Sequence, residues 1–353
     1  MIEIRGDILE GGGQIVRTSL SLAALTGEQI HLTRIRHKRP NPGLQPQHVT
    51  ATRAIATLCD AQTEGLRQGS TELTFKPNAH KSGKFKFDVG TAGSIPLVMQ
   101  ALMPCIAFAP DHVELEITGG TDVKWSPPID YIRLITVPTF HLMGYKLDLR
   151  VNRRGHYPKG GGSVTISTIP PKRLRNITLI KRDQPTSIEG VSHCVRLPTH
   201  VAQRQADAAS ETLTKAGYSE SNVKVESYAP DHDPHLGPGS GITLAANCTN
   251  ASVIGADALG ERGKPAEQVG EEAARKLIEE LNSEACLDRH MSDIIIPYMA
   301  VADGRSEISV SQMTMHTLTN IHLAEKILNV KFQVDGTVGQ TGRIAVTGVN
   351  LKT

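Results

Sequence analysis

The chain has 353 residues, of which 39% are hydrophobic and 4% aromatic, and its formal net charge is +2. This length allows two domains, or one large domain with an insertion, around an aliphatic core. No apolar run approaches the roughly 20 residues that cross a membrane, and the first residues do not resemble a signal peptide. We therefore expect a soluble, cytoplasmic protein with no membrane partner.

The first predicted unit is a strand followed by a helix. A short strand covers residues 2–4, and apolar residues at helical spacing continue to Gly27, which can end the helix. The segment 10–17, EGGGQIVR, lies at the turn between them, where free N–H groups and the helix dipole favour an anion. Arg17 can fork onto phosphate and Glu10 can hold a divalent ion. A glycine-rich turn with a solvated carboxylate is the alternative.

The same sequence of strand, polar turn, apolar helix and returning strand recurs twice. The second unit has its parts at 87–89, 90–94, 95–108 and 113–117. The third unit has them at 308–310, 313–317, about 318–328 and 330–334. Each turn leads to a helix N-terminus, so all three turns can face one site if the units pack around a common axis.

A different pattern of strands and polar helices fills the segment between the second and third units. Its strands are predicted at 188–195, 223–227 and 241–246, and its helices at 201–216 and 267–281. We therefore predict an α/β (α+β) fold: a discontinuous large domain, 1–180 and 280–353, holds the three repeats, and 181–279 forms a smaller inserted α/β domain. The loop 231–235, DHDPH, has metal-ligand residue types, although its proline favours a surface turn.

Basic residues gather in three segments of this nearly neutral chain. They are Arg34, Arg36, His37, Lys38 and Arg39; Lys81, Lys84 and Lys86; and Arg153, Arg154, His156 and Lys159. One such run is usually a solvated face, but three together favour a groove for a polyanion. His316 stands near the start of the third helix, where a neutral imidazole beside phosphate can attack phosphorus. An ordinary surface or core histidine is the alternative.

Seven short motifs occur in an order that resembles one protein family. They are 10–17 (EGGGQIVR), 39–43 (RPNPG) with Gln47 and His48, 90–94 (GTAGS) with Gln100, 119–122 (GGTD), 126–128 (SPP), 157–162 (YPKGGG) and 316–320 (HTLTN). Together they resemble the RNA 3′-terminal phosphate cyclase family. The resemblance covers residues 1 to about 180 and 286 to the end, and is weaker in the insertion.

The resemblance implies a ligase-type nucleotidyl transferase, RNA 3′-terminal-phosphate cyclase (ATP), that works in three steps. A histidine attacks the α-phosphorus of ATP and releases pyrophosphate; AMP then passes to an RNA 3′-phosphate; the neighbouring 2′-hydroxyl finally expels AMP and leaves a 2′,3′-cyclic phosphate. His316 matches the nucleophile. ATP and Mg²⁺ or Mn²⁺ are the implied cofactors, and RNA with a 3′-phosphate end is the implied partner. A homodimer is left open.

The resemblance also implies roles for other residues of this chain, which match the family's functional positions. Glu10 matches the metal-binding glutamate. The phosphate and RNA-end contacts match Arg17, Arg36, Arg39 and Gln47. The nucleotide contacts match Gln100, the adenine-stacking residues Pro127 and Tyr131, and the segment His290, Met291, Ser292, Asp293 and Ile294. Ile294 stands where the family usually has glutamine and cannot supply that amide hydrogen bond.

Two other protein classes share this architecture. A cyclase-like ribosome-assembly factor of the same fold is non-catalytic and lacks the nucleophilic histidine, so the presence of Glu10, Arg17 and His316 argues against it. Carboxyvinyl-transferring enzymes have a related repeat architecture but need no histidine adduct, and fold analogy alone does not identify them.

Overall fold

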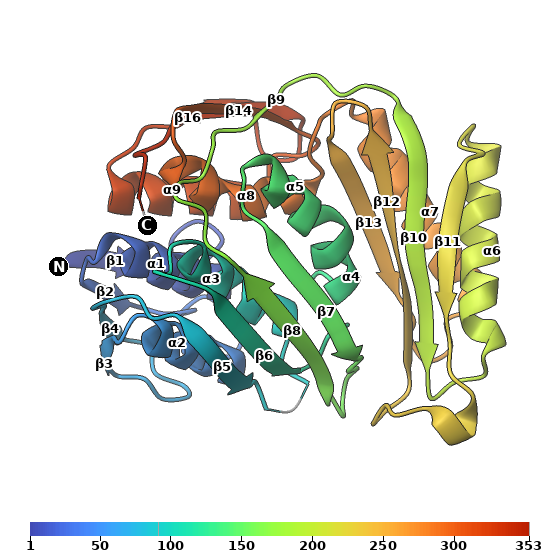
Figure 1. Cartoon of the computed structure of the whole chain (residues 1–353), viewed down its shortest axis with the longest axis horizontal. Coiled ribbons are helices and arrows are strands. Elements are labelled where there is room, and N and C mark those ends of the chain that lie inside the picture. Colours follow the sequence, from blue (N-terminus) through green and yellow to red (C-terminus); the bar gives the residue numbers. More distant parts are fainter. Residues whose placement is uncertain (91, 353) are drawn as a thin grey trace.

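The computed structural model describes residues 1–90 and 92–352, and Figure 1 shows the course of the chain. The described residues form four mixed sheets of four strands each, with helices packed against them. This arrangement confirms the predicted α/β (α+β) class with repeated strand–helix units. Thr91, in the predicted second glycine-rich turn, lies outside the described residues.

Three of the sheets follow one plan. Each takes its strands from a strand–helix–strand–helix–strand–strand unit, and the strands lie in the order first, second, fourth, third. The first two strands are parallel, and the other pairings are antiparallel.

The bounds of the three repeats are as follows. Repeat 1 consists of β1 (Ile2–Arg5), α1 (Gly13–Thr26), β2 (Ile30–Thr33), α2 (Pro46–Leu58), β3 (Gln62–Glu64) and β4 (Leu73–Lys76). Repeat 2 consists of β5 (Gly83–Asp88), α3 (Ile95–Ala107), β6 (Val113–Gly119), a helical segment made of α4 (Ile129–Tyr131), a π-helix (Ile132–Thr136) and α5 (Val137–Leu142), then β7 (Leu147–Arg153) and β8 (Gly162–Thr168). Repeat 3 consists of β9 (Thr178–Leu179), α8 (Arg289–Val301), β14 (Arg305–Val310), α9 (Met315–Leu328), β15 (Gln333–Asp335) and β16 (Gly342–Thr347).

The predicted third unit is therefore wrong in its boundaries. The strand β14 was expected to begin that unit, but it is the second strand of repeat 3 and pairs in parallel with β9. The predicted returning strand, β15, does not pair with β14; both pair with β16. The helix α9 is consequently the second helix of its repeat, whereas α1 and α3 are first helices. The first helix of repeat 3 is α8, which follows the insertion.

The inserted segment forms the fourth sheet, with strand order β11-β10-β12-β13. Its elements are β10 (Pro185–Val195), α6 (His200–Lys215), β11 (Ser221–Glu226), a 3₁₀ turn (Pro230–His232), β12 (Gly239–Cys248), β13 (Val253–Leu259) and α7 (Ala266–Asn282). Figure 1 shows α6 and α7 on the outer face of this sheet, with β13 nearest the large domain. A separate apolar core lies under these helices, with Leu213, Leu244 and Leu277 fully buried. The predicted boundaries at 181 and 279 stay a prediction.

The helices of the three repeats meet in one large core. α1 packs against α3 and α9, and α8 packs against α9. α3 is apolar around almost its whole circumference, which is typical of a helix buried on all sides. Leu20, Leu102 and Leu323 are fully buried there. Among the described residues, no helix has the length and apolar character needed to cross a bilayer.

Candidate active site

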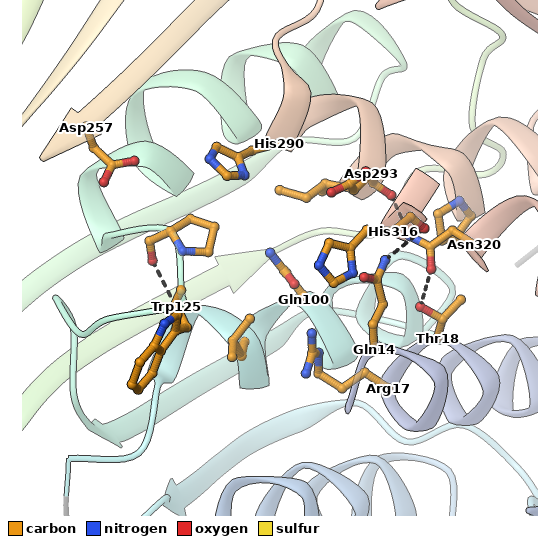
Figure 2. A pocket seen from close by; sticks show the side chains of 15 residues that line it. Gln14, Arg17, Thr18, Gln100, Trp125, Asp257, His290, Asp293, His316 and Asn320 are labelled. Atoms are coloured by element: carbon orange, nitrogen blue, oxygen red, sulfur yellow. Dashed lines mark hydrogen bonds between the residues drawn. The ribbon is translucent and has the colours of Figure 1, made fainter. Parts of the chain in front are cut away.

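A cavity of about 430 Å³ lies among the N-terminal parts of these helices, and Figure 2 shows the side chains around it. Its walls consist of Gln14, Arg17 and Thr18 from α1; Leu97 and Gln100 from α3; Trp125, Ser126 and Pro127 after β6; Asp257 from β13; His290, Asp293, Ile294 and Pro297 from α8; and His316 and Asn320 from α9. Within each helix these residues are one, three, four or seven positions apart, so each helix presents one face.

Seven predicted site residues line this cavity. They are Arg17, Gln100, Pro127, His290, Asp293, Ile294 and His316. Figure 2 shows Trp125 and Asp257 at one end, His316 and Arg17 towards the other, and Gln100 between them. Segments that are more than 300 residues apart in sequence, such as those of Gln14 and His316, are in contact: the Gln14 amide donates to the carbonyl of His316 (3.4 Å).

His316 lies in the first turn of α9. This helix begins at Met315, a few residues before the predicted start at about residue 318. The Thr314 hydroxyl caps it by accepting the N–H of Thr317 (2.9 Å). In the part of the chain that the structure describes, neither ring nitrogen of His316 has a hydrogen-bonding partner. Desolvation lowers the pKa of His316, and Arg17 and Arg39 lower it further while Glu10 opposes them. The imidazole is therefore neutral at pH 7 and has a free nitrogen lone pair facing the cavity.

Arg17 supplies positive charge to the same end of the cavity. Burial lowers its pKa to about 10, so the guanidinium stays charged at neutral pH. Among the described residues no carboxylate or carbonyl accepts a hydrogen bond from it. A desolvated guanidinium without a partner is unfavourable unless an anion binds it. This end of the cavity is thus suited to phosphate.

Glu10 lies beside this end but does not line the cavity. One carboxylate oxygen accepts the N–H of Gly12 (2.6 Å), the other forms an ion pair with Arg39, and the Glu10 N–H contacts the Thr319 hydroxyl (3.3 Å). A single carboxylate next to phosphate groups fits the way proteins hold Mg²⁺. Arg39 would have to move away for Glu10 to bind a metal ion.

We expect Gly12→Val to impair the RNA cyclase activity that the resemblance implies more than it lowers the stability of the fold. A Cβ at Gly12 would collide with the Glu10 carboxyl group, which is a movable side chain, and not with backbone. The valine should therefore displace Glu10 and lower activity by about 10²-fold, with a fall in melting temperature of only a few degrees. Steady-state assays and thermal unfolding would measure both, with Glu10→Ala as the matched comparison. Full activity of the Gly12→Val variant would contradict this role of the turn.

Asp293 joins α8 to the start of α9. Its Oδ1 accepts hydrogen bonds from the hydroxyls of Thr314 and Thr317 (both 2.6 Å), and its carbonyl accepts from the Asn320 amide (2.7 Å). Asn320 in turn accepts from the Thr18 hydroxyl of α1 (2.8 Å). These bonds fix the helix turn that carries His316. Burial raises the pKa of Asp293 to about 7 in spite of the threonine hydrogen bonds.

The raised pKa of Asp293 predicts a pH dependence of stability. The folded chain keeps this proton up to about pH 7, whereas the unfolded chain loses it near its ordinary pKa of 3.8. The stability contribution is therefore full at low pH and is lost as pH rises through 7. Urea unfolding at pH 5 and pH 8 should show that Asp293→Asn removes roughly 2 kcal/mol of this decline. The exposed-site variant Asp335→Asn should keep it, and an unchanged decline in Asp293→Asn would refute the assignment.

The opposite end of the cavity is lined by side chains with flat rings. Pro127 and the His290 ring both line it, and Trp125, which is 95% exposed, stands at its edge. Burial lowers the pKa of His290, while Asp257 opposes this shift. A neutral imidazole and a pyrrolidine ring are suited to stacking on a base.

Tyr131 is not exposed to the cavity in this structure, which does not support the stacking role predicted for it. Its ring is fully buried and does not line the cavity. Its hydroxyl donates to Asp288 (2.6 Å), whose carboxylate also caps α8 by accepting the N–H groups of His290 and Met291. The Tyr131 ring meets the His290 ring edge-on, with centroids 5.8 Å apart. Tyr131 is a positioning residue for the start of α8.

Met291 and Ser292 do not line the cavity either, contrary to prediction. Met291 is fully buried in the core, and the buried Ser292 hydroxyl donates to the Asp288 carbonyl (2.7 Å). The reason is helical geometry: α8 turns residues 290, 293, 294 and 297 towards the cavity and residues 291 and 292 towards the core.

Three predicted RNA-end residues lie outside the cavity, around the connection from β2 to α2. The Arg36 guanidinium donates to the carbonyls of Asn41 (2.5 Å) and Gly43 (3.2 Å), and Arg39 is held by Glu10. Gln47 lines a second cavity of about 310 Å³, together with Tyr157 and Pro158. The structure therefore does not place these three residues in the cavity that His316 lines.

Several residues that line the cavity were not predicted from the sequence. Gln14, Thr18 and Asn320 share helix faces with Arg17 and His316, so helical spacing could have found them. Asp257 could not be found in this way, since it lies on β13, a strand of the insertion that was not predicted. Burial raises the pKa of Asp257, while the nearby His290 lowers it.

A protein family model and several proteins of known sequence match this chain. The family model described as "RNA 3'-terminal phosphate cyclase" matches residues 8–334. A protein of that name from Ignicoccus hospitalis is 49% identical over 350 residues, covering 99% of both chains. Proteins of the same name from Pyrobaculum neutrophilum (50% identical, 95% of both chains) and Methanopyrus kandleri (47% identical, 98% of both chains) are also similar.

Among solved structures, an EPSP synthase from Acinetobacter baumannii covers 99% of this chain and 65% of its own. Its sequence is 12% identical and its TM-score is 0.30, so this likeness carries no argument about fold or activity.

Proposed function

Because the chain belongs to the RNA 3′-terminal phosphate cyclase family, we propose that it converts an RNA 3′-terminal phosphate to a 2′,3′-cyclic phosphate at the expense of ATP. The observation that carries this proposal is the pairing of the unpartnered His316 imidazole with the unpartnered Arg17 guanidinium at one end of a cavity. A neutral nucleophile beside a cation that has no acceptor among the described residues is suited to attack on a nucleotide phosphate.

In the proposed first step a ring nitrogen of His316 forms a bond to the α-phosphorus of ATP, and the bond from that phosphorus to pyrophosphate breaks. Arg17 neutralises charge on the phosphates, a role that suits a guanidinium with no hydrogen-bond acceptor among the residues that the structure describes. The lowered pKa of His316 keeps the attacking nitrogen unprotonated at neutral pH. The Asp293 and Thr314 hydrogen bonds hold the helix turn in place during attack.

The nucleotide base is assigned to the other end of the cavity. Pro127 and His290 provide the two flat surfaces, with Trp125 at the edge and Gln100 between base and phosphates. Ile294 lines the wall without a polar group. Recognition of the base or ribose on that side must come from other groups, for which Asp257 is our candidate.

In the second step an oxygen of the RNA 3′-phosphate replaces His316 on the adenylyl phosphorus. In the third, the adjacent 2′-hydroxyl attacks the 3′-phosphorus, AMP leaves and the cyclic phosphate closes. We assign the RNA end to the surface beside Arg36, Arg39 and Gln47, where guanidinium groups suit phosphate. Glu10 would hold Mg²⁺ or Mn²⁺, which supplies charge neutralisation for the leaving pyrophosphate when bound.

The test is to capture the intermediate and follow the RNA end. The full chain is incubated with α-labelled ATP and Mg²⁺ or Mn²⁺, and peptide mass spectrometry locates any AMP. We expect AMP on His316, its release on addition of an oligonucleotide with a 3′-phosphate, and a 2′,3′-cyclic end on that oligonucleotide. An oligonucleotide with a 3′-hydroxyl should neither discharge the protein nor change. RNA binding without protein-bound AMP would instead favour a non-catalytic assembly factor.

A further inference from the structure

A second group of buried side chains lies where the insertion meets the large domain, and none of its members lines the cavity described above. Asp122 follows β6, His156 follows β7, His193 lies on β10 and His235 precedes β12. Each of these residues is at most 6% exposed. The first two belong to repeat 2 and the other two to the insertion.

Three of these residues can supply ligand atoms to one point. Asp122, His156 and His193 each have a carboxylate oxygen or ring nitrogen within 4.8 Å of the others. The His193 Nε2 is 3.9 Å from an Asp122 oxygen, and the His156 and His193 rings have centroids 5.2 Å apart. The distance from His193 Nε2 to Asp122 is longer than a hydrogen bond and close to the separation of two ligand atoms that share one ion.

The same side chains have buried polar atoms without partners. Among residues 1–90 and 92–352, Asp122 Oδ1, His156 Nε2 and both ring nitrogens of His193 have no hydrogen-bonding partner. Leaving several such atoms unsatisfied in a protein interior is unfavourable, and groups of this kind call for a bound species. We propose that Asp122, His156 and His193 bind one divalent transition-metal ion, with zinc as the best fit to two imidazoles and a carboxylate.

The charges around the group are compatible with a bound cation. Asp122, Asp130 and Glu226 surround the buried Arg154, which contacts all three carboxylates. Arg133 also forms an ion pair with Asp130 (2.5 Å), so two arginines face three carboxylates and one negative charge is left to balance a cation.

His235 lies near the group, where it interacts electrostatically with His156 and His193, but its ring is not among the ligand atoms that lie within 4.8 Å of one another. Its Nδ1 contacts Asp233 Oδ1 (2.7 Å), and Asp233 is itself fixed by the N–H groups of Arg196 (2.6 Å) and His235 (2.9 Å). The His235 Nε2 is buried and without a partner. A histidine oriented by a carboxylate on its other nitrogen is the usual arrangement around metal ligands.

This location revises the prediction for the loop 231–235. The loop does not form a metal site by itself among the described residues, but its last residue, His235, is buried and interacts electrostatically with His156 and His193. An ion at this point would connect repeat 2 to the insertion, so we expect it to stabilise the fold. It would be a separate site from Glu10.

Metal content and thermal unfolding test the proposal. The full chain is stripped with a chelator, dialysed and loaded with Zn²⁺, and the bound zinc is counted by mass spectrometry. We expect about one zinc ion per chain and a melting temperature raised by roughly 5 °C. His193→Gln and His156→Gln should lose both effects, whereas Glu10→Ala and the exposed His141→Gln should keep both.

Cobalt gives a second measurement that needs no variant. Co²⁺ bound to the stripped wild-type chain should show the visible absorption of a low-coordinate nitrogen and oxygen site, and Zn²⁺ should remove it. Absence of that absorption would overturn the proposal even if the variants fail to fold. Equal zinc content in wild type and folded His193→Gln would overturn it as well.

Discussion

His316→Ala is expected to abolish protein-bound AMP and to lower cyclization by at least about 10³-fold. The proposed nucleophile is lost outright. His290 lies at the opposite end of the cavity and is assigned to the base, so it is not placed to replace His316. His48, the other histidine near Arg17, is 3% exposed, and burial together with Arg17 lowers its pKa to about 3. Its Nδ1 accepts the N–H of Gln45 (3.0 Å), and its ring packs against Gly13.

The matched control is His322→Ala, an exposed histidine two turns further along α9. Both variants should melt within about 2 °C of wild type, because neither side chain contributes to the core. Peptide mass spectrometry after incubation with ATP, together with single-turnover assays on a 3′-phosphorylated oligonucleotide, would measure the difference. Labelled AMP on the His316→Ala protein would refute the assignment of the nucleophile.

Arg17→Ala is expected to lower the rate of adenylylation by about 10²- to 10³-fold without destabilising the chain. The guanidinium faces the cavity without a protein acceptor, so its removal breaks no hydrogen bond of the fold. Burial is the main cause of its lowered pKa, which means that the charged form is poorly solvated in the folded chain. An unchanged or slightly higher melting temperature is therefore expected, together with a large loss of activity.

Arg53→Ala, an exposed arginine on α2, provides the comparison and should leave both quantities unchanged. Rates of AMP incorporation and melting temperatures, measured for wild type and the two variants, decide the matter. A loss of stability in Arg17→Ala that matched its loss of activity would mean that Arg17 supports the fold and does not bind phosphate.

The sequence predicted those parts of the fold that depend on local patterns. Helices α1, α3, α6 and α7 have apolar periodicity, and their observed bounds lie within about three residues of prediction. The third repeat was misread because strand pairing is not local: nothing between residues 308 and 334 indicates that β14 pairs with β9, across the whole insertion. The short strands β3 and β15 likewise depend on their partners for their stability.

The residues of the candidate site also separate into those that local sequence patterns indicate and those that depend on tertiary contacts. Glycine-rich turns and the start of α9 could be located from the sequence, and Arg17 and His316 lie together as the resemblance implied. Tyr131 could not be distinguished from a base-stacking residue, because only tertiary structure shows that its hydroxyl reaches Asp288, 157 residues away. Asp257 could not be predicted, since its place in the cavity depends on how β13 docks against repeat 2.

That docking restricts how the insertion can change during evolution. The Gly255 N–H of β13 donates to Asp288, the residue that caps α8, and Gly255 itself packs closely against Tyr131 and Ile135. A substitution there would disturb the helix that presents His290 and Asp293. Drift among descendants of this chain should therefore accumulate on the outer surfaces of α6 and α7, while the inner edge of the insertion stays nearly fixed.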